Sequence, residues 1–303
     1  MDSGYFSVNE FFRKKFHHRV DKIPLDAGFG CPNKDGTRSL RGCIFCDEYG
    51  SGPLRTGHLP LREQIQRFMD RYPDRKFAAY YQAHTNTYGP VAELKEKYEI
   101  IFDYPRIVAL FIGTRPDAIA EEVYPLLEGL RRRIYLSVEL GLQSVHERSL
   151  AFLNRNHTYS TFLNTHRRLT DLGIDVVVHL IVGIPGESRQ DLMETVGEIN
   201  RLRPAGVKLH LMHILKNTDL FERYRKAPFA LLGKDEYEDL IIQVLENLDP
   251  GIVIHRLTGE RDPEIFYRPR WALNKNAVIQ SIRRKMEQRK TRQGIRYAES
   301  LKK

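Results

Sequence analysis

The chain has 303 residues, of which 41% are hydrophobic and 29% charged, with a formal net charge of +9 at pH 7. These values are ordinary for a soluble globular protein, and the length suffices for one large α/β barrel or two smaller domains. No apolar run approaches the roughly 20 residues that cross a bilayer, and the N-terminus lacks the apolar core of a signal peptide. We therefore expect a cytoplasmic protein with no membrane partner.

Short apolar runs, separated by segments with helical periodicity, recur along the first two thirds of the chain. Between turn residues, such runs predict buried parallel strands. The six predicted strands span residues 22–27, 77–83, 106–113, 134–141, 174–183 and 206–214. Their spacing fits successive right-handed β–α crossovers, and six units predict an open α/β fold instead of a closed eight-stranded barrel.

The strand–helix rhythm breaks after about residue 216. Residues 216–248 have helical character, one more strand is predicted over 251–257, and a helix is predicted over 272–290. On that helix Trp271, Val278, Ile282 and Met286 fall near one face, which predicts docking onto the body of the protein. We therefore predict two domains, a barrel of residues 1–215 and an α-rich C-terminal extension of residues 216–303.

All of the excess positive charge lies at the C-terminal end. From Arg268 to Lys303 there are twelve Lys or Arg residues and two acidic ones, so this basic tail contributes +10 and the rest of the chain −1. Such a segment is a candidate contact for a polyanion, because each neutralised phosphate releases a counterion. The alternative is a solvated helix with a frayed end.

All three cysteines, Cys31, Cys43 and Cys46, lie in one sixteen-residue stretch, CPNKDGTRSLRGCIFC. An odd, clustered number of thiols argues against a disulfide framework and favours a metal site. Three thiolates suit a [4Fe–4S] cluster whose fourth iron stays open to a small molecule. A structural zinc site completed by a histidine such as His58, or ordinary buried thiols, are the alternatives.

Further candidates follow the predicted strands, because chemistry in barrel folds gathers at the C-terminal strand ends. Glu139 is an acid at the end of an apolar strand, which is unfavourable unless it is paired or functional. On the sixth strand Lys208, His210 and Met212 share one face. Gly183 would let the backbone approach a ligand closely. Arg115 follows the third strand and could pair across the turn with Asp117.

Several short motifs together resemble the radical S-adenosylmethionine (SAM) superfamily. An aromatic residue, Phe45, separates Cys43 from Cys46, and the phrases GLQS, NRNH and IPGE follow the fourth and fifth strands. The first gap between cysteines is eleven residues, wider than the usual C-x3-C-x2-C. With KDG in the cysteine loop and PRWALNK in the tail, the resemblance narrows to a group similar to the radical-SAM domain of the Elongator catalytic subunit, without its acetyltransferase domain.

This resemblance, which covers about residues 20–215, implies a partial TIM barrel, (βα)6, whose cysteines hold the [4Fe–4S] cluster. Reductive cleavage of SAM would give a 5′-deoxyadenosyl radical. Glu139, Lys208 and His210 are the candidate catalytic residues. The candidate SAM contacts are Thr85, Asn86, Thr87, Gln143, Arg155, His179, Gly183 and Met212. Of these, Thr85 to Thr87 stand where many relatives carry a Gly-Gly-Glu segment.

The implied substrate is tRNA, bound through the basic tail. The reaction implied is the remodelling of a wobble-uridine side chain from carboxymethylaminomethyl to aminomethyl, with electrons from a flavodoxin- or ferredoxin-type donor. A radical SAM enzyme acting on a small metabolite or a protein is the alternative, in which the tail serves only packing. A zinc-stabilised RNA-binding protein is a third hypothesis, but it leaves the Gln143–Arg155 pair unexplained.

Overall fold

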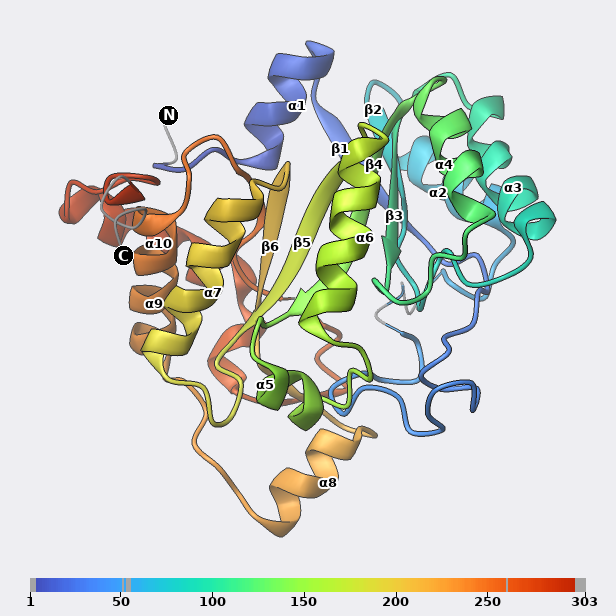
Figure 1. Cartoon of the computed structure of the whole chain (residues 1–303). Coiled ribbons are helices and arrows are strands. Elements are labelled where there is room, and N and C mark those ends of the chain that lie inside the picture. Colours follow the sequence, from blue (N-terminus) through green and yellow to red (C-terminus); the bar gives the residue numbers. More distant parts are fainter. Residues whose placement is uncertain (1–3, 51, 53–55, 260, 298–303) are drawn as a thin grey trace.

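The computed structural model describes residues 4–50, 52, 56–259 and 261–297. Within them, seven parallel strands form one curled sheet in the order β1-β2-β3-β4-β5-β6-β8 (Figure 1). The strands are β1 (Val20–Leu25), β2 (Lys76–Tyr81), β3 (Ile107–Thr114), β4 (Tyr135–Gln143), β5 (Asp175–Val182), β6 (Gly206–Leu211) and β8 (Val253–Arg256). The predicted partial TIM barrel is confirmed, and the six predicted strands correspond to β1–β6.

Helices between the strands cover the outer face of the sheet (Figure 1). Their bounds are α1 (Val8–Phe16), α2 (Leu61–Arg71), α3 (Val91–Glu99), η1 (Ile100–Asp103), α4 (Val123–Arg131), α5 (Glu147–Phe152), α6 (Tyr159–Asp171), α7 (Arg189–Leu202), α8 (Asp219–Lys226), α9 (Lys234–Asn247), η2 (Arg270–Leu273) and α10 (Lys275–Gln288). Each buries an apolar face, as α6 does with Phe162 and Leu169. Among the described residues no helix has the length and apolar character of a membrane span.

The strand register aligns polar side chains along one row of the sheet. Gly141 on β4 pairs with His179 on β5, which pairs with Lys208 on β6, and Lys208 pairs with Arg256 on β8. Because side chains alternate between the two faces of a strand, a shared row brings the last three to a common face. This row comes from four strands that are far apart in the sequence.

The seventh strand comes from the C-terminal extension. The predicted strand over 251–257 is β8, and it adds to β6 in parallel, so the extension completes the sheet. The end of the predicted sixth strand is instead β7 (Ile214–Leu215), which pairs antiparallel with β9 (Phe266–Arg268). The predicted C-terminal helix is present as η2 and α10. As predicted, it docks, because Val278, Ile282 and Met286 on α10 are buried against the body.

Helix α1, which the sequence analysis did not identify, closes the N-terminal end of the barrel. It packs on β1 and β8, and its Phe12 is buried beside Phe111, with ring centroids 5.9 Å apart. Val20 and Tyr80 belong to the same small apolar cluster. In Figure 1 this plug lies at the opposite end of the strands from the blue cysteine segment. The interior is therefore closed by α1 at the N-terminal strand ends and open at the C-terminal strand ends.

Candidate active site

One cavity brings most of the predicted site residues together. Its wall includes the three cysteines, which come from the loop after β1, and polar side chains from β2 through β8. Of the other predicted site residues, it is lined by Thr85, Glu139, Gln143, Arg155, His179, His210 and Met212. Lys208 lies directly behind this wall, bonded to Glu139. Residues from the two ends of the chain thus meet at one site.

Two predicted SAM contacts after β2 have structural partners instead. The Asn86 amide donates to the carbonyl oxygens of Tyr81 and Gly113, at 3.1 and 2.8 Å. The Thr87 hydroxyl bonds to Thr114 Oγ1 and to a backbone carbonyl, each at 2.6 Å. Both side chains are buried in the turn and do not line the cavity. Only Thr85 of this trio reaches it.

Gly183 also lies away from the cavity. It has a φ of +86°, and a Cβ there would come within 2.7 Å of Leu232. The positive φ favours glycine at this position, and the Leu232 side chain approaches it closely. It borders a separate hollow with Glu187 and Leu232.

Asparagine side chains fasten the cysteine loop to the loop between α5 and α6. The Asn33 amide donates to the Asn154 carbonyl at 2.7 Å and approaches Cys43 Sγ at 3.4 Å. Asn156 donates to Asn33 Oδ1 at 2.7 Å, and Asn154 donates to the Gly42 carbonyl. Both Asn154 and Asn156 have positive φ, a conformation that asparagine tolerates better than most residues. The NRNH motif thus holds the cysteine loop in position.

Two guanidinium groups face the central thiol. Cys43 is buried, with Arg155 Nη1 at 3.3 Å and Arg115 Nη1 at 3.8 Å from its sulfur. Burial raises the pKa of Cys43, but Arg155 and Arg115 outweigh burial and leave the pKa below its usual value. For Cys46, burial dominates and raises the pKa to about 12. Metal binding would therefore release a proton from Cys46, because the thiolate is the ligand form.

The cysteine geometry fits a cluster better than a single zinc ion. A tetrahedral zinc with Zn–S bonds of about 2.3 Å holds its sulfurs about 3.8 Å apart. The three cysteine sulfurs, all of them in the described part of the chain, do not all lie within 4.8 Å of one another. His58, the suggested fourth zinc ligand, is exposed and does not line the cavity. The three thiols thus suit a polynuclear cluster.

Gln143 and Arg155 converge at the end of β4, as predicted. A bulge between β4 and β5 gives Gln143 a φ of +78°, which is uncommon for a residue with a side chain. Arg155 Nη2 donates to the Gly141 carbonyl at 2.7 Å. A Cβ on Gly141 would come within 3.0 Å of both side chains, at 2.8 Å from Gln143 Nε2 and 2.9 Å from Arg155 Nη2. Arg115, by contrast, is held by Asp117 through two bonds of 2.9 Å, the pairing suggested from the sequence.

A polar floor, made of Lys22, Glu139, His179, Lys208, His210 and Arg256, lies deeper in the barrel. Glu139 is fully buried and binds Lys22 and His179 Nε2, each at 2.8 Å, and also Lys208. Burial raises the pKa of Glu139, but Lys208 and Lys22 hold it well below its usual range. This carboxylate is therefore ionised and fully engaged by the floor itself.

The basic groups of the floor have lowered pKa values because they are buried. Burial lowers the pKa of Lys208 well below its usual value, and Lys22 and Arg256 act in the same direction. It also lowers the pKa of His179 to about 4 and that of His210 well below the ordinary histidine value. Both histidines are therefore neutral at pH 7. Because His179 Nε2 donates to Glu139, its Nδ1 carries the lone pair.

Several site residues were not identified from the sequence. They are Lys22, Lys34, Tyr80, His84, Arg256 and Arg261. Lys22 and Arg256 lie inside two predicted buried strands, where a charged residue is unfavourable unless it has a purpose. The same pattern, a charged residue within an apolar strand, marks Glu139 in the sequence. Lys34 and Arg261 contact Asp47 beside Cys46, which only the folded loop shows.

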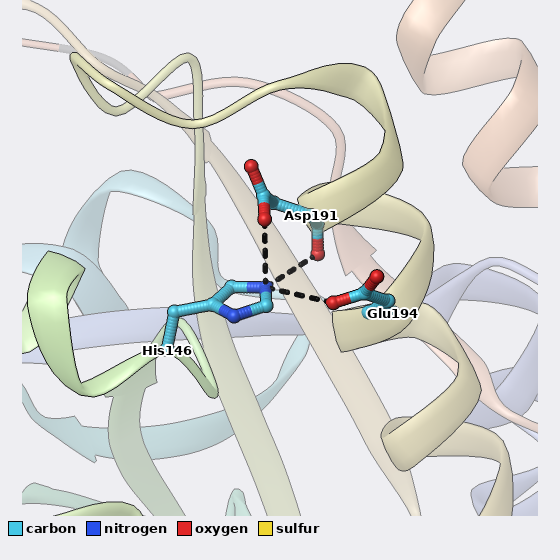
Figure 2. A group of neighbouring side chains, drawn as sticks. All are labelled: His146, Asp191 and Glu194. Carbon is cyan, nitrogen blue, oxygen red and sulfur yellow. Dashed lines mark hydrogen bonds and ion pairs between the residues drawn. The ribbon is translucent and has the colours of Figure 1, made fainter.

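A second group of possible metal ligands, His146, Asp191 and Glu194, lies outside the cavity (Figure 2). His146 Nε2 is 2.9 Å from the Asp191 carbonyl oxygen, which can only accept, so this nitrogen carries a proton. The Asp191 carboxylate accepts from the backbone and hydroxyl of Ser188 at the start of α7 and also binds Arg148. The ligand atoms are thus already used to fasten α5 to α7.

The helix of the basic tail, α10, lies away from the cavity. In Figure 1 α10 is at the left and the blue cysteine segment at the lower right. Lys285 binds three acids of α9, Asp235 at 3.0 Å, Glu238 at 2.8 Å and Asp239 at 3.4 Å. Arg289 also binds Asp239, at 2.6 Å. Part of the tail's charge is therefore neutralised by α9, and this pairing stabilises the helix packing.

The fold is a partial TIM barrel, and its cavity contains three cysteines as a candidate metal centre. Residues 29–199 match the family model described as the Radical SAM superfamily, and residues 204–288 match the Radical_SAM C-terminal domain. The chain belongs to the radical SAM superfamily. It is an enzyme of this class, which uses a [4Fe–4S] cluster and SAM, and both cofactor predictions are confirmed at the level of the family.

Relatives extend the comparison. Uncharacterized protein YtqA of Bacillus subtilis (strain 168) is 39% identical over 298 residues, 97% of this chain and 92% of that protein. The tRNA uridine(34) acetyltransferase of Methanocaldococcus jannaschii is 30% identical over 141 residues, which cover 45% of this chain and 25% of the relative. The structure of archaeal Methanocaldococcus infernus Elp3 with an N-terminal deletion matches with a TM-score of 0.64 and 19% identity, covering 77% of this chain and 59% of that one. This last likeness is one of fold.

Proposed function

We propose that this radical SAM enzyme modifies the wobble uridine of a tRNA, converting a carboxymethylaminomethyl side chain to an aminomethyl one. The observation that carries the proposal is the single cavity, with three cysteines and the Gln143–Arg155 pair at its mouth and excess cationic charge on its floor. The similarity to a tRNA uridine(34) acetyltransferase supports RNA as the substrate. The electron donor in this proposal is of the flavodoxin or ferredoxin type.

The residues divide into two groups. Cys31, Cys43 and Cys46 would hold the cluster, and Gln143 and Arg155 would hold the amino-acid end of SAM, since an arginine fork matches a carboxylate. When bound, these cofactors supply a 5′-deoxyadenosyl radical, which takes a hydrogen atom from a C–H bond.

On the floor, Glu139 binds both Lys208 and His179 and so fixes the positions of these two side chains. Burial lowers the pKa of Lys208, which makes its ammonium a better proton donor to a departing amine. His179 presents Nδ1 as an acceptor, and His210 lines the same wall. Glu139, Lys208 and His210 remain the proposed catalytic group.

The test uses protein reconstituted anaerobically with iron and sulfide, then given SAM, dithionite and tRNA that carries carboxymethylaminomethyluridine. We expect 5′-deoxyadenosine, measured by chromatography, and aminomethyluridine, identified by mass spectrometry of the digested tRNA. Uridine without the side chain should give no modified product. If 5′-deoxyadenosine forms and the modified nucleoside is left intact, the proposed substrate is wrong while the radical chemistry stands.

A second candidate is a small metabolite or a protein as the substrate. It is favoured by the engagement of Lys285 and Arg289 with α9, since charge used for packing is not free for RNA. Salt-dependent binding of tRNA separates the two hypotheses. Truncation after Tyr267 would remove α10 and its buried face, so point variants are the sounder probe of the tail. An enzyme that consumes SAM and has no tRNA affinity at any salt concentration would favour the second candidate.

A further inference from the structure

The polar floor contains one cation without a partner. Its one carboxylate, Glu139, is shared by Lys22 and Lys208, and the floor therefore has more positive than negative groups. The Arg256 guanidinium lines the cavity but forms no hydrogen bond or ion pair with any residue in the described part of the chain. A guanidinium inside a cavity with no acceptor is unfavourable unless a ligand supplies one.

His210 provides a second unpartnered polar atom on the same wall. Its Nε2 is buried and has no hydrogen-bond partner among the described residues. His210 lies two residues beyond Lys208, which is the register partner of Arg256, so the two unused groups come from adjacent strands. The charge of Arg256 also contributes to lowering the pKa of His210, after burial, which agrees with their closeness.

Arg256 is separate from the arginines expected at the cofactors. The pKa of Cys43 responds to Arg155 and Arg115, whereas Arg256 acts on the lysines and histidines of the floor. Arg155 approaches Cys43 within 3.3 Å and is therefore the arginine suited to SAM bound beside the cysteines. The cavity thus has one cluster of cationic side chains at its mouth and a separate cluster on its floor.

We propose that Arg256 and His210 form a subsite for the carboxylate of the substrate. The inference rests on the proposed function, because the carboxymethylaminomethyl group carries such a carboxylate. An arginine fork can bind both carboxylate oxygens, and a neutral imidazole can donate a further hydrogen bond from Nε2. A substrate anchored there would extend from the floor toward the cysteines. The seventh strand, from the C-terminal extension, would then determine which side chain is accepted.

The experiment compares two anticodon stem-loops, one with the free acid and one with its methyl ester, on reconstituted enzyme with SAM at a fixed salt concentration. We expect wild type to bind the acid about 10- to 100-fold more tightly than the ester, as a charged hydrogen bond predicts. Arg256→Gln should bind both equally, and Arg256→Lys should fall between. The matched control is Arg167→Gln, which makes the same change in charge at an exposed arginine on α6 that does not line the cavity. It should keep the wild-type ratio.

Two further measurements on the same proteins separate the possible failures. The dissociation constant for SAM should be unchanged in Arg256→Gln, and a tenfold loss there would assign Arg256 to the SAM carboxylate and overturn the proposal. If neither stem-loop binds, the proposed RNA substrate is wrong, and the carboxylate subsite is tested with sodium acetate instead. The subsite is supported if acetate raises the melting temperature of wild type, acetamide does not, and acetate does not raise that of Arg256→Gln. Equal behaviour of wild type and Arg256→Gln with acetate, or an unchanged acid-to-ester ratio, overturns it.

Discussion

The mouth and the floor of the cavity both contain positively charged side chains, but they differ in whether the protein supplies enough anions to pair with them. At the mouth, Arg155 and Arg115 lie against Cys43, so cationic charge stabilises a thiolate that a metal would bind. On the floor, Lys22 and Lys208 already share the Glu139 carboxylate, and Arg256 remains in excess. The mouth is therefore arranged around protein-derived anions and the floor around an anion from outside. This difference is what the proposed function requires, with the cofactors at one end of the cavity and the substrate at the other.

The sharpest way to break this contrast is to remove the thiolate at the mouth. Cys43→Ala should abolish 5′-deoxyadenosine formation, because a cluster cannot be held by two cysteines in this site. Iron content after reconstitution and product by chromatography are the measurements. Thr37→Ala is a control within the same loop, since its hydroxyl bonds the Tyr88 hydroxyl and Asp35 and contacts none of the three cysteines. Retained iron and full product in Cys43→Ala would assign the centre to other ligands.

On the floor, Glu139→Gln should destabilise the fold by about 3–5 kcal/mol, because it leaves Lys22 and Lys208 buried without a counter-charge. Urea unfolding of the cofactor-free protein measures the change. Glu121→Gln removes an exposed carboxylate that also binds an arginine, and it should change stability by less than about 1 kcal/mol. A loss of stability below about 1 kcal/mol for Glu139→Gln would show that Lys22 and Lys208 do not need the Glu139 carboxylate as a counter-charge.

The floor should also make stability depend on pH. Burial lowers the pKa of His179 to about 4. Between pH 6.5 and 4 the unfolded chain therefore binds a proton at this histidine that the folded protein does not, so the free energy of unfolding falls as the pH falls through that window. Between pH 7 and 5, the free energy of unfolding of His179→Gln should fall by about 2 kcal/mol less than that of wild type. Urea midpoints at the two pH values give the result, with exposed His58→Gln as the control. Identical losses in wild type and His179→Gln would contradict a buried neutral imidazole.

The smallest expected effect is on the salt dependence of tRNA binding, and it concerns the basic tail, a candidate RNA contact distant from the mouth of the cavity. Lys290 and Arg292 are exposed, and if they contact phosphates, replacing each with Gln should reduce the salt slope of tRNA binding by about 1. The formation of 5′-deoxyadenosine in the absence of tRNA should not change. Lys285→Gln serves as the comparison, since this lysine is engaged by α9. An unchanged slope in the Lys290 and Arg292 variants would leave the tail with a packing role alone.

Local sequence patterns were sufficient for much of this enzyme. The three cysteines are clustered within one loop, so their shared role needed no knowledge of distant contacts. The strands β1–β6 were predicted because each is a short apolar run between turns, and α10 because Val278, Ile282 and Met286 repeat at helical spacing. The convergence of Gln143 and Arg155 followed from a motif at one strand end.

Tertiary structure alone decided the floor and the direction of several side chains. Lys22 contacts Glu139, which is 117 residues away in the sequence, and His255, which is 233 residues away. Arg256 joins this group because β8 adds to the edge of the sheet. No local periodicity encodes such a pairing. Likewise Asn86 and Thr87 were predicted at the cofactor from their position after β2, but they turn inward because nearby backbone carbonyls need donors. The sequence by itself therefore determined the candidate residues at the mouth, and only the closure of the sheet determined which charges share the floor.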